Sequence, residues 1–289
     1  MRDYAITTDS SCDFDQALAD SLGVTVVPLS VQIGPRRFRN APGEAMDSHS
    51  FYQLLSQGEL AQTSAPNVEE FKAVWRPILQ SGRDLLYLGF SSGLSGTYHN
   101  AAIAAEDLRE EFPEARIITV DTLCASLGQG MLVDLTVQEK RQGKTLDEAA
   151  AFAEKNRLHL CHWFTVGDLS QLRRGGRLSA GKAIVGNLLN IKPVLHVDDE
   201  GHLVPMASAK GRKKSIEALV SHMEESAVAP EQQRVYISHG DCLADAQLLA
   251  QMVRDRLHVA SVTIGDVGPV IGAHSGAGTL ALFFVGTHR

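Results

Sequence analysis

Leu88-Gly89-Phe90-Ser91-Ser92-Gly93-Leu94-Ser95-Gly96-Thr97 joins an apolar stretch to a long helical pattern. The apolar residues that end at Phe90 predict a buried strand over 84–90, and the pattern that follows predicts a helix over 95–111. Hydroxyl side chains therefore gather where a strand leads into a helix N-terminus. Unpaired N–H groups and the positive end of the helix dipole meet there, which favours an anion such as a carboxylate or phosphate. An ordinary Ser/Gly turn with an N-cap explains the same residues, so both interpretations stay open.

Strands and helices alternate around this segment. In the first half the patterns predict strands over 4–8, 24–31 and 116–120, helices over 14–22, 67–79 and 126–142, and a loop over 35–50. This order is typical of an α/β domain with a mostly parallel sheet and flanking helices. Ligand sites in such sheets lie at the carboxyl ends of the strands, where residues 8–10, 91–95 and 121–122 are expected.

The second half is richer in strands. We expect helices over 145–157, 213–226 and 243–257, and strands over 163–166, 191–197, 202–208, 234–238, 259–264 and 279–285. The polar turn at 198–201 predicts a hairpin, so this sheet should be a mixed one. The sequence therefore predicts an α/β protein of two lobes, with an N-terminal lobe over residues 1–150 and a C-terminal mixed α/β lobe over 151–289.

Composition narrows the class of protein. The chain has 289 residues, a formal net charge of -7 and 44% hydrophobic residues, which fits a sizeable core and argues against a general nucleic-acid binder. We expect no signal peptide and no membrane span, and hence a cytoplasmic protein. The four cysteines have neither zinc-site nor CxxC spacing, so we expect buried or incidental reduced thiols and no metal site.

Two motifs suggest enzymes. Residues 176–183 nearly match the phosphate-binding loop GxxxxGK[ST], but Ala183 replaces the magnesium-binding hydroxyl and the preceding segment is helix-like, which disfavours nucleotide binding. Residues 93–97 resemble a nucleophile elbow in which Thr97 replaces the last glycine. A serine-dependent hydrolase or transferase that uses Ser95, with His239 or His274 nearby in space, therefore remains the alternative function.

Small and basic residues mark two further candidate sites. Residues 274–278, His-Ser-Gly-Ala-Gly, form an expected loop between two apolar strands, where small neighbours would let a ligand head group approach the backbone. Arg173, Arg174 and Arg177 surround a Gly-Gly pair, and Lys210 to Lys214 form a second basic patch. Such clusters are either solvated surfaces or docking sites for an acidic partner or a phosphate.

Several segments, taken together and in order, resemble the DegV family. They are residues 6–11, 63–66, 91–98, 121–126, 172–179, 190–193 and 274–278. The resemblance covers almost the whole chain. Two positions depart from the family pattern: Asn67 replaces the last hydroxyl of TSxPS, and Lys210-Gly211-Arg212 stands where the family has an Arg-Gly pair.

The FakB-type members of this family are fatty-acid-binding proteins, so the resemblance implies a lipid carrier rather than an enzyme. It implies one long-chain fatty acid buried between the two lobes, with no other cofactor, and a partner fatty acid kinase (FakA-like) that converts the carboxylate to an acyl phosphate. Transient contact with a membrane surface is compatible with this role. By the same resemblance Thr63, Ser95 and His274 bind the carboxylate, and Arg177 is a candidate for docking the kinase.

Overall fold

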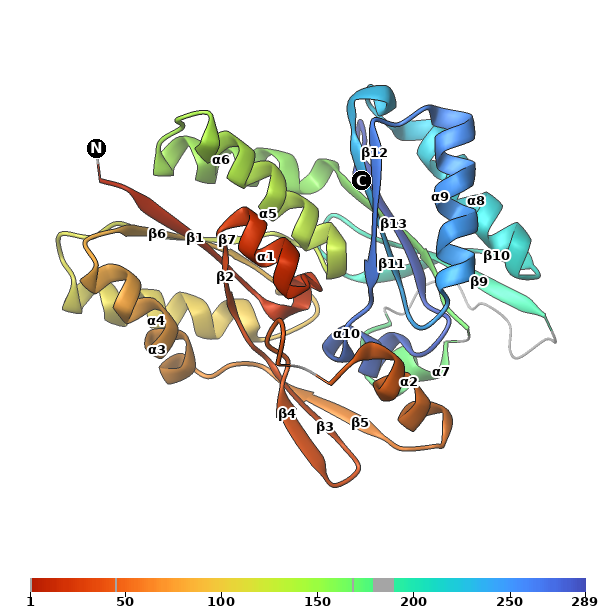
Figure 1. Cartoon of the computed structure of the whole chain (residues 1–289), viewed down its shortest axis with the longest axis horizontal. Coiled ribbons are helices and arrows are strands. Elements are labelled where there is room, and N and C mark those ends of the chain that lie inside the picture. The colour runs from red at the N-terminus through yellow and green to blue at the C-terminus, as the bar shows by residue number, and fades with distance from the viewer. Residues whose placement is uncertain (1, 45, 168, 179–189) are drawn as a thin grey trace.

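Three sheets and the surrounding helices make up the structure, a computed structural model that describes residues 2–44, 46–167, 169–178 and 190–289 (Figure 1). Sheet A is wholly parallel, with the strand order β2 (Thr25–Val27), β1 (Tyr4–Asp9), β6 (Asp84–Gly89), β7 (Ile117–Asp121). Sheet B is antiparallel, with the order β4 (Arg36–Arg39), β3 (Ser30–Ile33), β5 (Ala61–Ser64).

Sheet C is mixed. Its order is β10 (Leu203–Lys210), β9 (Ile191–Val197), β8 (Leu160–Thr165), β13 (Leu280–Val285), β11 (Arg234–His239), β12 (Ser261–Asp266). Only β11 and β12 pair in parallel; the other neighbours are antiparallel. The expected fold class, a parallel N-terminal sheet and a mixed C-terminal sheet, is therefore confirmed.

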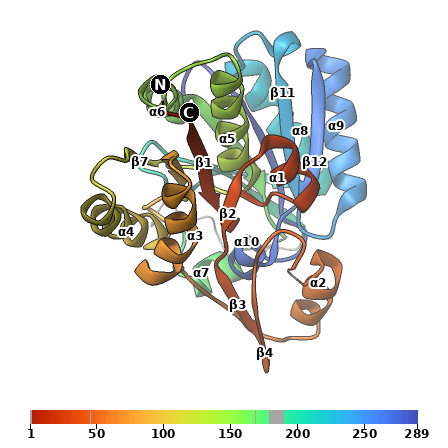
Figure 2. The same ribbon diagram turned by 60° about the vertical axis from the view of Figure 1, so that its left-hand side comes forward.

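The helices build layers around the two larger sheets (Figures 1 and 2). One face of sheet A carries α3 (Val68–Gln80) and α4 (Thr97–Glu111), and the outer face of sheet C carries α8 (Arg212–Ser226) and α9 (Leu243–Leu257). Between the sheets lie α5 (Ser126–Arg141), α6 (Leu146–Asn156) and α1 (Gln16–Leu22). Near sheet B are α2 (Ser48–Ser56), α7 (Ser170–Arg174) and α10 (Pro269–Ser275). Short 3-10 turns are η1 (Ser10–Cys12), η2 (Arg157–His159) and η3 (Pro230–Gln232).

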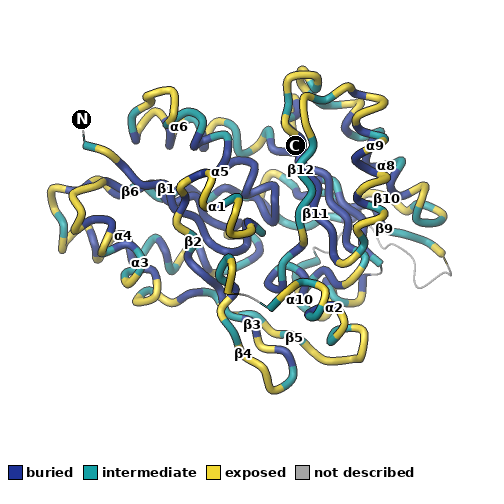
Figure 3. The backbone as a smooth tube through the Cα atoms, viewed as in Figure 1, coloured by how far each residue is buried: buried dark blue, intermediate teal, exposed yellow. Residues whose placement is uncertain are grey.

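Helix α5 connects the two larger sheets through one apolar core (Figure 3). Leu88 of sheet A, Leu127 and Met131 of α5, and Phe164 and Phe283 of sheet C all belong to this core. Because α5 packs against both sheets, residues 126–134 are all buried. This part of the helix therefore has no solvent-exposed face of the kind that surface helices show. The division of the chain at residue 150, which falls within α6, remains a prediction.

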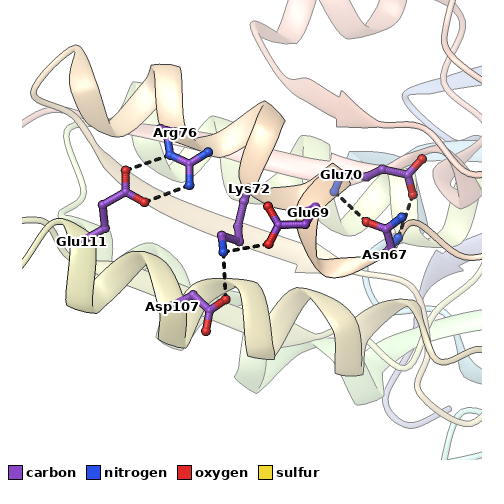
Figure 4. A network of polar contacts seen from close by, with 7 residues as sticks. All are labelled: Asn67, Glu69, Glu70, Lys72, Arg76, Asp107 and Glu111. Carbon is purple, nitrogen blue, oxygen red and sulfur yellow. Dashed lines mark hydrogen bonds and ion pairs between the residues drawn. The ribbon is translucent and has the colours of Figure 1, made fainter.

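Capping and surface ion pairs fix α3 against α4 (Figure 4). The Asn67 side chain accepts a hydrogen bond from the Glu70 N–H, and the Glu70 carboxylate accepts one from the Asn67 N–H, so the two residues form a capping box at the start of α3. Across the helix pair, Lys72 Nζ lies 3.0 Å from Asp107 and Arg76 Nε lies 2.8 Å from Glu111. Exposed pairs of this kind each contribute under about 1 kcal/mol.

Three predicted segments were wrong. The single strand expected over 24–31 is two strands, β2 and β3, which end and begin on either side of Pro28 and belong to different sheets. The loop expected over 35–50 contains β4 and the start of α2. Residues 274 and 275, expected in a loop, end α10, whose first residue is Pro269. Proline is well tolerated at the first position of a helix because its missing N–H has no partner there.

The positions of the cysteines agree with the expectation of buried or incidental thiols. All four are free; Cys12, Cys124 and Cys161 are buried, and Cys242 is half-buried. Within the described ranges, no helix combines the length and the apolar character that crossing a bilayer requires.

Candidate functional site

A cavity of about 220 Å³ lies where residues of sheets B and C meet the segment that follows β6 of sheet A. Most of its wall is apolar, and the large side chains include Phe90, Leu94, Phe164, Ile271 and Phe283. Phe90 follows β6, Phe164 and Phe283 come from β8 and β13, and Ile271 comes from α10. The cavity is therefore part of the same interface that α5 fills elsewhere, and its mostly apolar wall suits an apolar ligand.

Thr63, Ser95, His274 and Arg177 all lie on the wall of this cavity. Thr63 is held on β5 by pairing with Val31 of β3, and His274 lies in the last turn of α10. The Thr63 Oγ1 atom is 2.8 Å from His274 Nε2, across 211 residues of sequence. The structure thus brings together every residue that the resemblance singled out, whereas their roles toward a ligand remain proposals.

His274 is uncharged at neutral pH. Burial, and secondarily the positive charge of Arg177, lower the pKa of His274 to about 4. A Cβ atom on Gly175 would lie 2.5 Å from His274 Nδ1, so the glycine after α7 allows the chain to approach the ring. Because Thr63 and a neutral His274 share one hydrogen bond, the pair keeps one further donor for a carboxylate: the Thr63 hydroxyl when His274 carries its proton on Nε2, or the Nδ1–H in the other tautomer.

Ser95 lies just before α4. Its Oγ atom accepts a hydrogen bond from the Thr97 N–H at 3.2 Å and lies 2.8 Å from Thr97 Oγ1. Gly96, the N-cap residue, provides no side-chain cap, so the first turn of α4 presents backbone N–H groups beside the cavity. Among the described residues no histidine is hydrogen-bonded to Ser95, and a nucleophilic serine would need such a base.

Arg177 supplies a positive charge at this end of the cavity. Its Nε atom donates a hydrogen bond to the Leu94 carbonyl at 3.2 Å, which fixes the guanidinium near the turn that precedes α4. Partner docking was the role expected for Arg177, and its place on the cavity wall was not predicted. The nearby Gly175, which permits a close approach to His274, was the available signal.

A surface recess of about 350 Å³ adjoins the polar end of the cavity. Both spaces share Thr63, Arg177 and His274, and the recess adds Leu60 and Arg174 among others. Because the same three side chains line both spaces, a group bound by them would lie between the buried cavity and the surface.

Other residues at the carboxyl ends of the sheet A strands have structural roles. Asp9 is fully buried and accepts hydrogen bonds from Tyr87 Oη at 2.7 Å and from the Phe90 N–H at 2.8 Å. Ser91 donates to the Gly201 carbonyl at 2.9 Å, and Asp121 accepts from the Ser92 N–H at 3.2 Å. Of the hydroxyls at 91–95, only that of Ser95 reaches the cavity.

The near match to a phosphate-binding loop and His239 are the remaining candidates from the sequence. Residues 179–189, which include most of the near match to a phosphate-binding loop, fall outside the described residues, and the segment before them forms helix α7. His239 lies 3.5 Å from Asp266, away from the cavity wall. The ranges that the structure covers contain no group of three or more His, Cys, Asp or Glu side chains placed to hold a metal ion.

Sequence comparison identifies the family. The sequence model of the DegV family, described as a family of uncharacterised proteins, matches residues 3–287. The chain belongs to the DegV family. A DegV domain-containing protein of Clostridium perfringens is 41% identical to it over 286 residues, which are 99% of this chain and 98% of the relative.

Solved DegV structures share the whole fold. A DegV family protein from Thermus thermophilus, described by its fatty-acid binding, is 33% identical, with a TM-score of 0.87 over 98% of this chain and 99% of the other. A DegV lipid-binding protein from Thermotoga maritima is 28% identical, with a TM-score of 0.88 and 99% coverage of both chains. The architecture of this chain is therefore that of solved DegV proteins from end to end.

Proposed function

We propose that this chain binds a single long-chain fatty acid in the cavity and presents its carboxylate to a partner fatty acid kinase. The proposal rests on the combination of a mostly apolar cavity with four polar side chains on its wall, those of Thr63, Ser95, His274 and Arg177. Fatty-acid binding by the DegV protein from Thermus thermophilus supports it.

The apolar tail would supply most of the affinity. Burying about 14 methylene groups contributes roughly 11 kcal/mol before the costs of association, at about 0.8 kcal/mol each. A hydrogen bond to a carboxylate contributes on the order of 1.5–3 kcal/mol. In this proposal the apolar wall sets affinity, and the polar residues fix which end of the fatty acid faces the recess.

Presentation to a kinase follows from the adjoining recess. A carboxylate held by Thr63 and His274 would be reachable from the surface, because both residues also line the recess. In the transfer step, a carboxylate oxygen forms a bond to the γ-phosphorus of ATP on the kinase, and ADP leaves. Neutral donors hold the anion while keeping an oxygen available, and Arg174 and Arg177 would face the incoming phosphates.

Fatty-acid binding is tested by lipid analysis of the freshly purified protein and by titration of delipidated protein with hexadecanoic acid. We expect a copurified fatty acid in a 1:1 complex by native mass spectrometry. Thr63→Ala and Ser95→Ala should each weaken binding at least about tenfold, since each removes a hydrogen bond to a charged group. Ser92→Ala, an exposed serine off the cavity wall, is the matched control. Unchanged affinity in both site variants would refute the assignment of the carboxylate site.

Kinase presentation needs a separate test. Arg174→Glu, at an exposed residue of the recess, should leave fatty-acid affinity within about twofold and slow acyl-phosphate formation by a fatty acid kinase at least about tenfold. Arg83→Glu makes the same charge change at an exposed position outside the recess. Equal rates of acyl-phosphate formation with the two variants would reject docking at this surface. A kinase that forms no acyl phosphate with the loaded wild-type protein would reject presentation itself.

A further inference from the structure

Strand β12, the last strand of sheet C, borders a surface groove that the proposed function does not use. This groove, which we call the β12 groove, has a volume of about 880 Å³, and α1 lines its opposite side (Figure 2). Among the described residues, none lines both this groove and the cavity or the recess. A role of the β12 groove is therefore separate from fatty-acid binding.

One edge of β12 has unpaired backbone groups. The N–H groups of Ser261 and Val267 donate to the carbonyls of Gln233 and His239, which lie at the two ends of β11. Because successive residues of a strand direct their backbone groups to opposite edges, the N–H and C=O groups of residues 262 and 264 point away from β11. No group among the described residues is hydrogen-bonded to them.

Strand β12 lacks the features that usually protect a sheet edge. At the opposite edge of sheet C, β10 carries Pro205, and its register shifts between Pro205 and Ala207. Prolines and bulges of this kind hinder the pairing of a further strand. In β12 six consecutive residues pair regularly with β11, and none of them is proline, lysine or arginine. Sheet C is thus protected at one edge and open at the edge that borders the groove.

Apolar side chains line part of the β12 groove. Phe14 and Leu18 contribute from the chain at α1, and Leu127 from α5. Leu243, at the start of α9, also lines the groove and is 51% exposed. An extended peptide directs its side chains alternately to two sides, so apolar residues at every second position would cover these side chains.

The charged side chains of the groove are acidic. Asp15, Asp47 and Asp266 are exposed, and among the described residues no lysine or arginine lines the groove. Asp15 and Asp47 each accept one backbone N–H through Oδ1 at the start of a helix, which leaves Oδ2 for another donor. Burial raises the pKa of Asp13 to about 8, so this residue adds little charge at neutral pH. The groove consequently favours lysine or arginine side chains on a bound segment.

We propose that the β12 groove binds an extended, basic segment of another protein, which adds to sheet C as a further strand beside β12. The backbone of the segment would pair with residues 262 and 264, and its basic side chains would contact Asp15, Asp47 and Asp266. A second copy of this chain fits less well. Two β12 strands paired edge to edge would bring both sets of carboxylates together, and like charges on paired strands repel.

Fluorescence anisotropy with a short fluorescein-labelled peptide of alternating lysine and valine tests the backbone pairing. We expect saturable binding of one peptide to each wild-type chain. The same peptide methylated at every backbone nitrogen keeps its charge but cannot donate to a strand edge. It should bind at least about tenfold more weakly. Equal affinity of the two peptides would show attraction by charge alone and would overturn the proposal.

Variants of the protein test the place of binding. Asp266→Lys should weaken binding of the unmethylated peptide at least about fivefold, and Asp199→Lys, the same charge change at an exposed residue outside the groove, less than about twofold. Ile264→Pro removes an N–H from the open edge and spares the pairing with β11, so it should also weaken binding about fivefold. If Ile264→Pro does not fold, the methylated peptide still tests the same hydrogen bonds.

Each remaining outcome decides against the proposal. Equal losses of affinity in Asp266→Lys and Asp199→Lys would mean that the net charge of the chain, and not the groove, attracts the peptide. Absence of binding by the wild type at low salt would exclude the site. Sedimentation that shows wild-type chains associating with one another, and Asp266→Lys chains remaining single, would assign the groove to a second copy. The titration with hexadecanoic acid is unaffected by these results, so the proposed function is tested separately.

Discussion

At the scale of single residues, Asp13 is a carboxyl group whose charged form the fold disfavours. Burial raises the pKa of Asp13 to about 8, although hydrogen bonds from Ser126 and from the Gly268 N–H act in the opposite direction. The carboxyl oxygens contact the starts of both α5 and α10, at 2.5 Å from Ser126 Oγ and 3.1 Å from the Gly268 nitrogen. Its protonation state therefore affects the two helices that border the cavity.

The raised pKa of Asp13 predicts that the free energy of unfolding falls as pH rises. Between the ordinary pKa of 3.8 and the folded value of about 8, the folded chain holds a proton that the unfolded chain has released. The contribution of Asp13 to the free energy of unfolding is therefore largest below pH 4 and decreases up to pH 8. Asp13→Asn keeps the size of the side chain and removes this titration. Urea unfolding of both proteins at pH 5, 6, 7 and 8 should show the wild type losing stability relative to the variant. A difference that stays constant across this range would contradict the shift.

A second titration opposes the first at acidic pH. Burial lowers the pKa of His162 to about 3, so the folded state favours the neutral ring. The stability that depends on neutral His162 is complete above pH 6.5 and decreases as pH falls toward the folded value. His162→Gln should flatten the loss of thermal stability between pH 6.5 and 4.5, measured against wild type. An equally steep loss in the variant would exclude His162 as its cause.

The four residues of the candidate site differ in how well the sequence alone predicted them. Thr63 and His274 lie 211 positions apart, and no periodicity joins them; only the resemblance to a family predicted that they share a site. Ser95 was accessible to physical reasoning, because a hydroxyl before a helix N-terminus suggests anion binding. A cluster of arginines usually lies on the surface, so the sequence predicted a docking role for Arg177. Its place on the cavity wall depends instead on a contact with the remote Leu94 carbonyl, which no local pattern predicts.

At the scale of elements, long periodic segments were predicted well and short polar ones were not. Helices such as α8 and α9 carry an apolar face long enough to define them, and they lie within one residue of the predicted ranges. Strand β4, Arg36–Arg39, has three arginines around one phenylalanine, so its strand character comes from pairing with β3 rather than from its own sequence.

Close packing of α5 gives a prediction at this scale. A Cβ atom on Gly128 would lie 2.2 Å from His162 Nε2 and 2.7 Å from Phe283 Cδ1, so alanine there must push α5 away from sheet C. We expect Gly128→Ala to lower the free energy of unfolding by about 1–3 kcal/mol despite the better helix propensity of alanine. Gly96→Ala, where no atom lies within 4 Å of the added Cβ, is the control. Denaturant titration measures the free energy of unfolding of both variants. If Gly128→Ala is as stable as wild type, the interface between α5 and sheet C has room for the added methyl group, which would contradict the prediction.

At the scale of the whole molecule, Arg289 joins segments that are remote in sequence. Its guanidinium donates to the Leu123 carbonyl at 2.8 Å, the Asp198 carbonyl at 2.9 Å and the Leu160 carbonyl at 3.2 Å. Leu123 follows sheet A, whereas Leu160 and Asp198 belong to or follow strands of sheet C. One side chain thus connects both halves of the fold.

Removing this side chain's donors should destabilise the molecule. Arg289→Met keeps an aliphatic chain but leaves several carbonyls without their donor, at an expected cost of about 1–3 kcal/mol. Arg254→Met, at an exposed arginine of α9, controls for the loss of charge. Thermal unfolding should show a lower midpoint for the first variant only. Equal midpoints would mean that water replaces the arginine without loss.

The position of β13 affects how the molecule is assembled during synthesis. This strand comes last along the chain, yet it lies inside sheet C, between β8 and β11. Until residues 280–285 have left the ribosome, β8 and β11 expose unpaired edges, and a nascent chain with such edges is prone to join with other chains. The ligand cavity, which Ala281 and Phe283 help to line, is likewise incomplete until that moment. If the cavity binds a fatty acid as proposed, loading must follow translation, and a stalled or truncated chain would be a substrate for chaperones.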